Sequence, residues 1–293
     1  MLDNEPLHKR GWTLQERYLS RRMLHYTKYQ MFWECKEGVF TERGEKSPRT
    51  CCLESVTYGD PDIGPPWYQD WLKLVEKYSG RKLTVGNDRL PALSGMASRL
   101  ADAMGDQYCA GIWQSRILHG ISWRRKWFVS SSNSEGILPA PSWSWASINA
   151  PVQFYPRGIE KRSKPYVAHT TVLSIDIEPE GENLYGAVRS GRLTMRGPLL
   201  KVEATMDSMH FFYWDRYDER KYPCYVLPLW TQGRGEPLDS DCQARGLVGL
   251  IVKPTSTDHT EFRRVSLVAP PRPGETCKVM YYKAADVRDL TLV

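Results

Sequence analysis

The sequence predicts an α+β protein, in which a tryptophan-rich first half containing helices precedes a second half made mainly of strands. Nine of the 11 Trp residues lie before residue 146, whereas 14 of the 20 Pro residues lie at or after Pro139. Apolar residues at helical spacing fill the first half, and frequent Pro is typical of strands joined by loops. The 293 residues, of which 41% are hydrophobic, suffice for one large or two modest domains with a real core.

The first dense cluster of polar and aromatic residues lies in residues 10–22, which we expect to form a single helix. In one interpretation Thr13 is the N-cap and Glu16 reaches back to its backbone N–H, as in a capping box. In the other, Trp12 and Glu16 share a helical face and offer an indole and a carboxylate to a sugar or a positive charge. The Arg21–Arg22 pair fits a helix C-terminus, where the dipole favours cations.

Strands are expected next, over residues 23–27 and 30–35, as a hairpin or as two neighbouring strands. Residues 65–80 then have the apolar spacing of an amphipathic helix that begins at a Pro-Pro pair and ends at a glycine. Asp88 is the expected N-cap of a second helix that ends at Gly105. A shorter third helix is predicted over residues 113–121.

The second half contains β-prone runs joined by Gly, Pro and Asp turns. They span residues 166–177, 192–195, 224–230, 247–252, 263–268 and 278–282. We therefore expect three parts, over residues 1–50, 51–150 and 151–293, with a seam near residues 151–164.

Composition excludes several classes of protein. The formal net charge of +6 includes no long basic run, so nucleic acid and acidic membranes are permitted but not indicated as partners. No stretch has the roughly 20 uncharged residues of a membrane helix, and the amino terminus does not fit a signal peptide, which together predict a cytoplasmic protein. The seven Cys include no C-x-x-C pair, so reduced thiols are expected and no metal site is.

General catalytic motifs do not identify a reaction. The chain contains no P-loop, no G-x-G-x-x-G, no H-E-x-x-H and no G-x-S-x-G signature. A cofactor is therefore not expected.

Three stretches near the amino terminus carry a resemblance to a known family. The first consists of Arg10, Gly11, Trp12, Thr13, Leu14, Gln15 and Glu16. The second spans residues 19–26, and the third consists of Phe32, Trp33, Glu34 and Cys35. Together they closely resemble the last conserved block of the fungal heterokaryon incompatibility (HET) domain. Residues 71–79, 83–84, 88–97, 106–113 and 140–147 are similar to the region that follows this block in many such proteins.

The HET resemblance implies a role in fungal non-self recognition and programmed cell death, with protein partners of unknown identity. It also implies that the first part is the remnant of an α/β, TIR-like domain, followed by a helical segment and a β-rich region. Full-length members carry earlier blocks upstream, whereas this chain begins nine residues before the last one. We therefore expect a truncated, non-catalytic member of the family.

An alternative function comes from a more distant resemblance. The segment from Trp12 to Glu16 is similar to the Trp-x-x-x-Glu stretch that carries the catalytic glutamate of NAD-cleaving TIR enzymes. On this hypothesis NAD is the substrate, and Glu16 contacts the nicotinamide ribose. Its carboxylate then stabilises the oxocarbenium-like charge that forms as the N-glycosidic bond breaks.

Two further aromatic segments have competing interpretations. Trp143 and Trp145 alternate with Ser, which favours a strand with both indoles on one face in a structural, core role, and a sugar-stacking platform is the alternative. The run from Trp123 to Trp127 mixes bases and indoles, as in a solvated edge or in a nucleic-acid-binding module.

Overall fold

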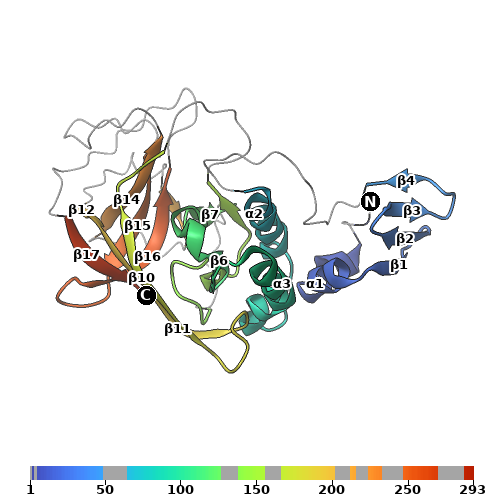
Figure 1. Ribbon diagram of the computed structural model, residues 1–293, viewed down its shortest axis with the longest axis horizontal. Helices are drawn as coiled ribbons and strands as arrows, with labels where there is room; N and C mark the ends of the chain where they lie inside the picture. The colour runs from blue at the N-terminus through green and yellow to red at the C-terminus, as the bar shows by residue number, and fades with distance from the viewer. Residues whose placement is uncertain are drawn as a thin grey trace.

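The computed structural model has a mixed α+β fold, as the sequence predicts (Figure 1). It describes residues 2, 5–48, 65–126, 138–155, 166–201, 212–215, 224–232, 247–269 and 287–293. A small sheet and α1 lie at one end, the helices α2 and α3 lie in the middle, and a large sheet lies at the other end (Figure 1). Within the described ranges, no helix combines the length and the apolar character needed to cross a membrane.

The small sheet has four antiparallel strands in chain order, packed beside α1. The elements of this part are η2 (Pro6–Lys9), α1 (Trp12–Leu19), β1 (Arg22–Tyr26), β2 (Met31–Cys35), β3 (Gly38–Thr41) and β4 (Lys46–Ser47). The predicted hairpin is confirmed, because β1 and β2 pair directly, with Leu24 opposite Trp33 and Tyr26 opposite Met31.

Two helices form the middle of the molecule, α2 (Pro66–Ser79) and α3 (Ser94–Met104). Helix α2 follows the prediction: Pro66 occupies its first turn, and Trp71, Leu74 and Tyr78 are buried along one face. Helix α3 ends at Gly105, whose φ of 65° is the left-handed conformation that glycine adopts without strain.

The start of α3 differs from the prediction. Two 3-10 segments, η3 (Gly86–Arg89) and η4 (Pro91–Leu93), precede the helix, and Leu93 occupies the N-cap position. Asp88 lies within η3, so its assignment as the N-cap is wrong. The apolar repeat runs on into the 3-10 turns, which made the helix look longer than it is.

Short elements follow α3. They are β5 (Tyr108–Cys109), β6 (Ile112–Trp113), η5 (Gln114–Arg116), α4 (Ile117–Gly120), β7 (Trp123–Arg125), η6 (Trp145–Ser147) and β8 (Val152–Phe154). The end of β6, η5 and α4 take the place of the predicted third helix. Only α4 of the 113–121 prediction is α-helical. The expected strand through Trp143 and Trp145 is also wrong, because these residues lie in turns and in η6.

The large sheet has nine strands, with the order β10-β11-β17-β16-β15-β14-β12, while β13 pairs with β16 and β9 pairs with β14. Its strands are β9 (Tyr166–Ala168), β10 (Thr171–Pro179), β11 (Val188–Pro198), β12 (Leu200–Lys201), β13 (Phe212–Trp214), β14 (Tyr225–Gln232), β15 (Leu247–Pro254), β16 (Glu261–Val268) and β17 (Val287–Leu292). Five of the six predicted runs contain strands, and residues 278–282 lie outside the described ranges. The strands β12, β13 and β17 were not predicted.

One buried cation joins the large sheet to the middle of the chain. The side chain of Arg264 in β16 is fully buried, and its Nη1 donates a hydrogen bond of 2.8 Å to the carbonyl of Ile121. Its Nη2 donates to the carbonyl of Trp123, and its guanidinium lies 3.3 Å from the centroid of the Trp123 ring. Asp215 neutralises the charge, with 3.2 Å between Arg264 Nε and Asp215 Oδ2. Buried apolar residues from Leu14 to Leu292 form one cluster around this contact.

We expect Asp215→Ala to destabilise the protein by about 3–5 kcal/mol, because it removes the carboxylate beside a buried guanidinium. Urea unfolding followed by tryptophan fluorescence measures the change. Asp289→Ala is the matched control, since the ion pair of Asp289 with Arg196 is exposed and its loss leaves the midpoint almost unchanged. Equal midpoints for the two variants would contradict the role assigned to Arg264.

Candidate functional site

The first HET-like stretch, residues 10–16, connects α1 to the middle of the molecule, and we call this contact region the joint. The N–H of Gly11, the N-cap of α1, donates to the carbonyl of Lys82 over 2.8 Å, and the N–H of Lys82 donates to Lys9. A Cβ at Gly11 would lie 2.4 Å from Leu83 Cδ2. This close approach explains a glycine next to the bridge between Arg10 and Lys82.

The predicted capping box is absent. The Thr13 side chain makes no cap to the α1 N-terminus, and its hydroxyl instead lies 2.8 Å from the Leu7 carbonyl and 2.9 Å from the Arg10 carbonyl. Glu16 is exposed on α1. The helix begins two residues earlier than a Thr13 cap requires, so Glu16 is not at its third position.

The remaining residues of this stretch also make packing contacts. Trp12 Nε1 donates to Asp88 Oδ2 over 3.0 Å, and Leu14 is buried in the main core. Gln15 Oε1 accepts a hydrogen bond of 2.8 Å from the N–H of Gly95 in the first turn of α3. Leu93 cannot cap α3 with its side chain, so Gln15 supplies the missing acceptor from a neighbouring helix.

Helix α1 is shorter than predicted. It ends at Leu19, with Ser20 at the C-cap, and Arg22 is the first residue of β1. The expectation that Arg21 and Arg22 close a helix C-terminus is therefore wrong.

Glu34 of the third HET-like stretch is the centre of a buried polar cluster. Its Oε2 lies 2.8 Å from Arg17 Nε and 2.7 Å from His25 Nε2, and its side chain has no exposure to solvent. The Nη1 of Arg17 lies 3.4 Å from His8 Nδ1, and the His8 and His25 rings meet edge to face at 5.3 Å. Side chains from η2, α1, β1 and β2 therefore meet in one hydrogen-bonded group.

Sequence reasoning found Glu34 but missed its partners His8, Arg17 and His25. The signal for Arg17 was its spacing of three and four from Leu14 and Thr13, which puts it on the buried face of α1. The signal for His25 was its alternation with exposed Leu24 and Tyr26 in β1.

The tryptophans of the predicted aromatic segments are buried, whereas a tryptophan of the third HET-like stretch is exposed. Trp143 and Trp145 are fully buried, and Trp145 Nε1 donates to the carbonyl of Gly111 over 2.9 Å. Trp123 is also fully buried beneath Arg264, so the solvated edge expected there is wrong for this residue, and Trp127 lies outside the described ranges. Trp33, in contrast, is exposed on β2.

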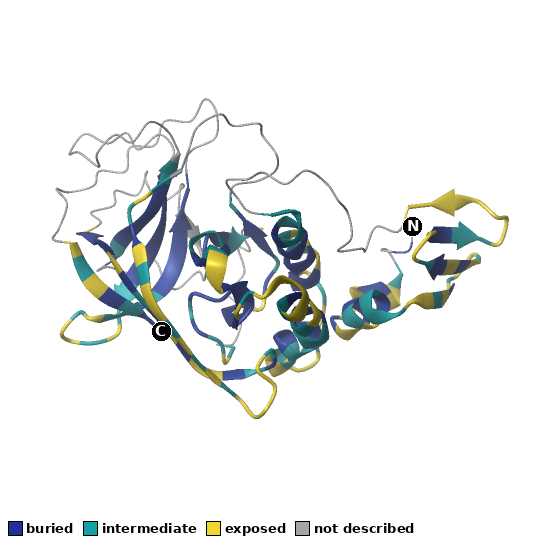
Figure 2. Cartoon of the chain, viewed as in Figure 1, coloured by how far each residue is buried: buried dark blue, intermediate teal, exposed yellow. Residues whose placement is uncertain are grey.

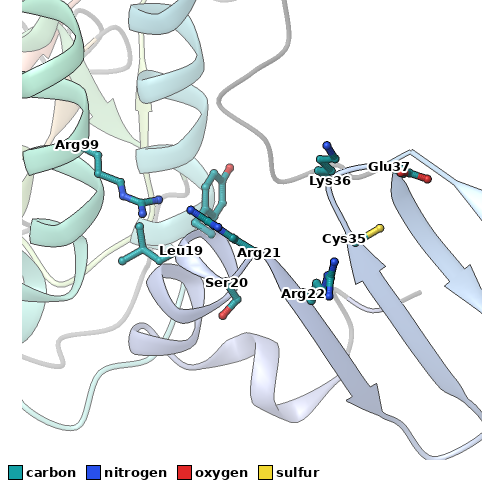
Figure 3. A pocket seen from close by; sticks show the side chains of 9 residues that line it. Leu19, Ser20, Arg21, Arg22, Cys35, Lys36, Glu37 and Arg99 are labelled. Atoms are coloured by element: carbon teal, nitrogen blue, oxygen red, sulfur yellow. The ribbon is translucent and has the colours of Figure 1, made fainter.

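A cavity of about 560 Å³ lies where α1, the small sheet and α3 meet (Figure 3). It is lined by Tyr18, Leu19, Ser20, Arg21, Arg22, Cys35, Lys36, Glu37 and Arg99. Residues 19–22 of the second HET-like stretch and Cys35 of the third line this cavity, whereas Glu16 of the first does not. The two parts of the predicted site, Glu16 and the Trp33–Cys35 segment, therefore do not share one pocket among the described residues.

Metal ligands are not clustered in the described ranges, where no group of three or more His, Cys, Asp or Glu side chains is placed to hold an ion.

Comparisons with models of known protein families, with curated proteins and with solved structures give no match to this chain.

We expect Glu34→Ala to lower the free energy of unfolding by about 3–5 kcal/mol, because it removes the carboxylate that neutralises buried Arg17. Chemical unfolding measures this loss. Glu37→Ala is the control, since Glu37 is exposed in the turn after β2 and its replacement should change stability by less than about 0.5 kcal/mol. A loss for Glu34→Ala as small as that of the control would rule out the buried cluster.

Proposed function

We propose that the chain is a HET-family protein that acts in the cytoplasm, in fungal non-self recognition and cell-death signalling, by binding a protein partner and without catalysis. The support from the sequence is the resemblance of residues 10–35 to the last HET block. The support from the structure is a group of exposed apolar residues on the small sheet, beside the joint that this block forms. Figure 2 shows that the strands of this sheet carry exposed positions.

The exposed apolar face consists of Leu24, Tyr26, Met31 and Trp33, which are 45%, 77%, 37% and 43% exposed. These residues form two cross-strand pairs on one side of the β1–β2 hairpin. The other side carries buried His25, Phe32 and Glu34, so the strands alternate between core and solvent (Figure 2). An antiparallel sheet ordinarily exposes polar residues on its outer side, so four neighbouring apolar side chains there favour a binding surface.

The composition of this face indicates a protein as the partner. Trp, Tyr, Met and Arg are enriched at the centres of protein interfaces, and Trp and Tyr are frequent hot spots. Arg22 lies on the same side of β1 as Leu24, and Lys28 follows β1 in the hairpin turn. The partner surface is accordingly apolar at its centre and acidic at its margin.

The position of Glu16 favours a role without catalysis. A carboxylate that stabilises an oxocarbenium-like charge needs a site from which water is excluded. Glu16 is exposed on α1 and does not line the described cavity, and the indole N–H of the nearby Trp12 is engaged by Asp88.

The signalling proposal is tested by expression in a filamentous fungus, alone and beside a full-length HET protein. We expect the wild-type chain to change growth or cell death in at least one setting, and the double variant Leu24→Ser, Trp33→Ser to lose the effect. Leu184→Ser is the control, because Leu184 is exposed but lies far from this face in sequence and outside the small sheet. Absence of any phenotype for the wild type, or an equal phenotype for the double variant, would refute the proposal.

We also expect the purified chain to release no nicotinamide from NAD above the level given by Glu16→Gln, because an exposed carboxylate provides no preorganised pocket. Chromatography of the reaction mixture measures the product. Release by the wild type that Glu16→Gln abolishes would establish the enzymatic alternative instead.

A further inference from the structure

The cavity at the joint has a strongly cationic lining. Arg21 comes from the link between α1 and β1, and Arg22 is the first residue of β1. Lys36 comes from the turn after β2, and Arg99 comes from α3. Glu37 is the one carboxylate among the described lining residues. Arg21 and Arg99 extend toward one another across Leu19 (Figure 3).

Among the described residues, these four cations lack the carboxylate partners that several other arginines of the chain have. Buried Arg17 and Arg264 have carboxylate partners, and so do the surface residues Arg189, Arg192 and Arg196. Within the part of the chain that the structure describes, no ion pair or hydrogen bond is made by the side chain of any cation in the cavity. Four like charges around one hollow repel each other, and an anion between them removes that repulsion.

We propose that this cavity binds a compact polyanion that carries two or more phosphate groups. A single carboxylate or monoanion would leave most of the lining charge uncompensated. Arginine presents a planar fork of donors that matches phosphate oxygens, and three of the four cations are Arg. The volume of about 560 Å³ falls in the range of small-molecule sites, about 300–1,000 Å³.

A ligand in this cavity contacts two parts of the molecule at once. Three of the cations belong to the small sheet and its link, and Arg99 belongs to α3 in the middle of the molecule. The small sheet projects from α1, away from the other helices (Figure 1). A polyanion held by Arg21 and Arg99 together therefore ties the small sheet to α3 and limits its motion relative to the rest of the chain.

The test is calorimetric titration of the full chain with inorganic tripolyphosphate and with orthophosphate, at low and high salt. We expect tripolyphosphate to bind at least about tenfold more tightly, with affinity that falls as salt rises, since several charges are neutralised together. Arg99→Gln and the double variant Arg21→Gln, Lys36→Gln should each weaken binding about tenfold. Arg43→Gln, an exposed cation of the same small sheet that does not line the cavity, should leave the affinity unchanged.

Two further measurements identify the source of the phosphate and the place of binding. Co-sedimentation with vesicles that contain a bisphosphorylated phosphoinositide, lost in Arg99→Gln, assigns a lipid headgroup, whereas binding of tripolyphosphate alone assigns a free ligand. Tripolyphosphate should also slow alkylation of Cys35, which lines the cavity. Cys109 is the internal control and stays unlabelled at pH 8, because burial raises its thiol pKa to about 12.

Three outcomes overturn the proposal. They are the absence of tripolyphosphate binding at low salt, an affinity that Arg99→Gln leaves unchanged, and an equal loss in Arg43→Gln. Because these variants change exposed side chains away from the two buried ion clusters, each should fold, and circular dichroism confirms this before the titration.

Discussion

The contact between Arg17 and Glu34 sets the direction in which the small sheet leaves the body of the protein. Arg17 belongs to α1, which packs against α3, and Glu34 belongs to β2, so one buried ion pair joins the small sheet to α1. The separate apolar cluster of the small sheet contains just Leu2, Phe32 and Val39 among the described residues. A core of that size stabilises a sheet weakly. The polar group therefore determines where the apolar face and the cationic cavity lie.

Several residues of the HET-like stretches act through packing. Gly11 permits close approach to Leu83, Gln15 caps α3, and Glu34 holds the hairpin. Exposed side chains of the second and third stretches, together with Met31 and Arg99, instead form the exposed side of β1 and β2 and the cationic lining around Arg21.

Local periodicity predicted the elements whose apolar residues face one core, such as α2 and the β1–β2 hairpin. It failed where tertiary contacts replaced local ones. Asp88 has the residue type of an N-cap but accepts from Trp12, 76 residues away, and Gln15 caps a helix 80 residues distant. Trp143 and Trp145 alternate as in a strand, yet turns place both indoles in the core. The cavity joins Arg99 to residues near position 21, a neighbourhood that no short motif encodes.

The long sequence separation between Arg264 and its hydrogen-bond partners affects how the protein folds during synthesis. Its donors meet the carbonyls of Ile121 and Trp123 across 143 and 141 residues of chain. During synthesis residues 121 and 123 leave the ribosome long before β16 does. Until β16 is made, the Trp123 ring lacks the guanidinium that covers it in the folded protein. The middle of the molecule is therefore an unfinished structure for roughly half of translation, and contacts so distant in sequence slow its completion. Until then its aromatic interior is a surface that chaperones can recognise.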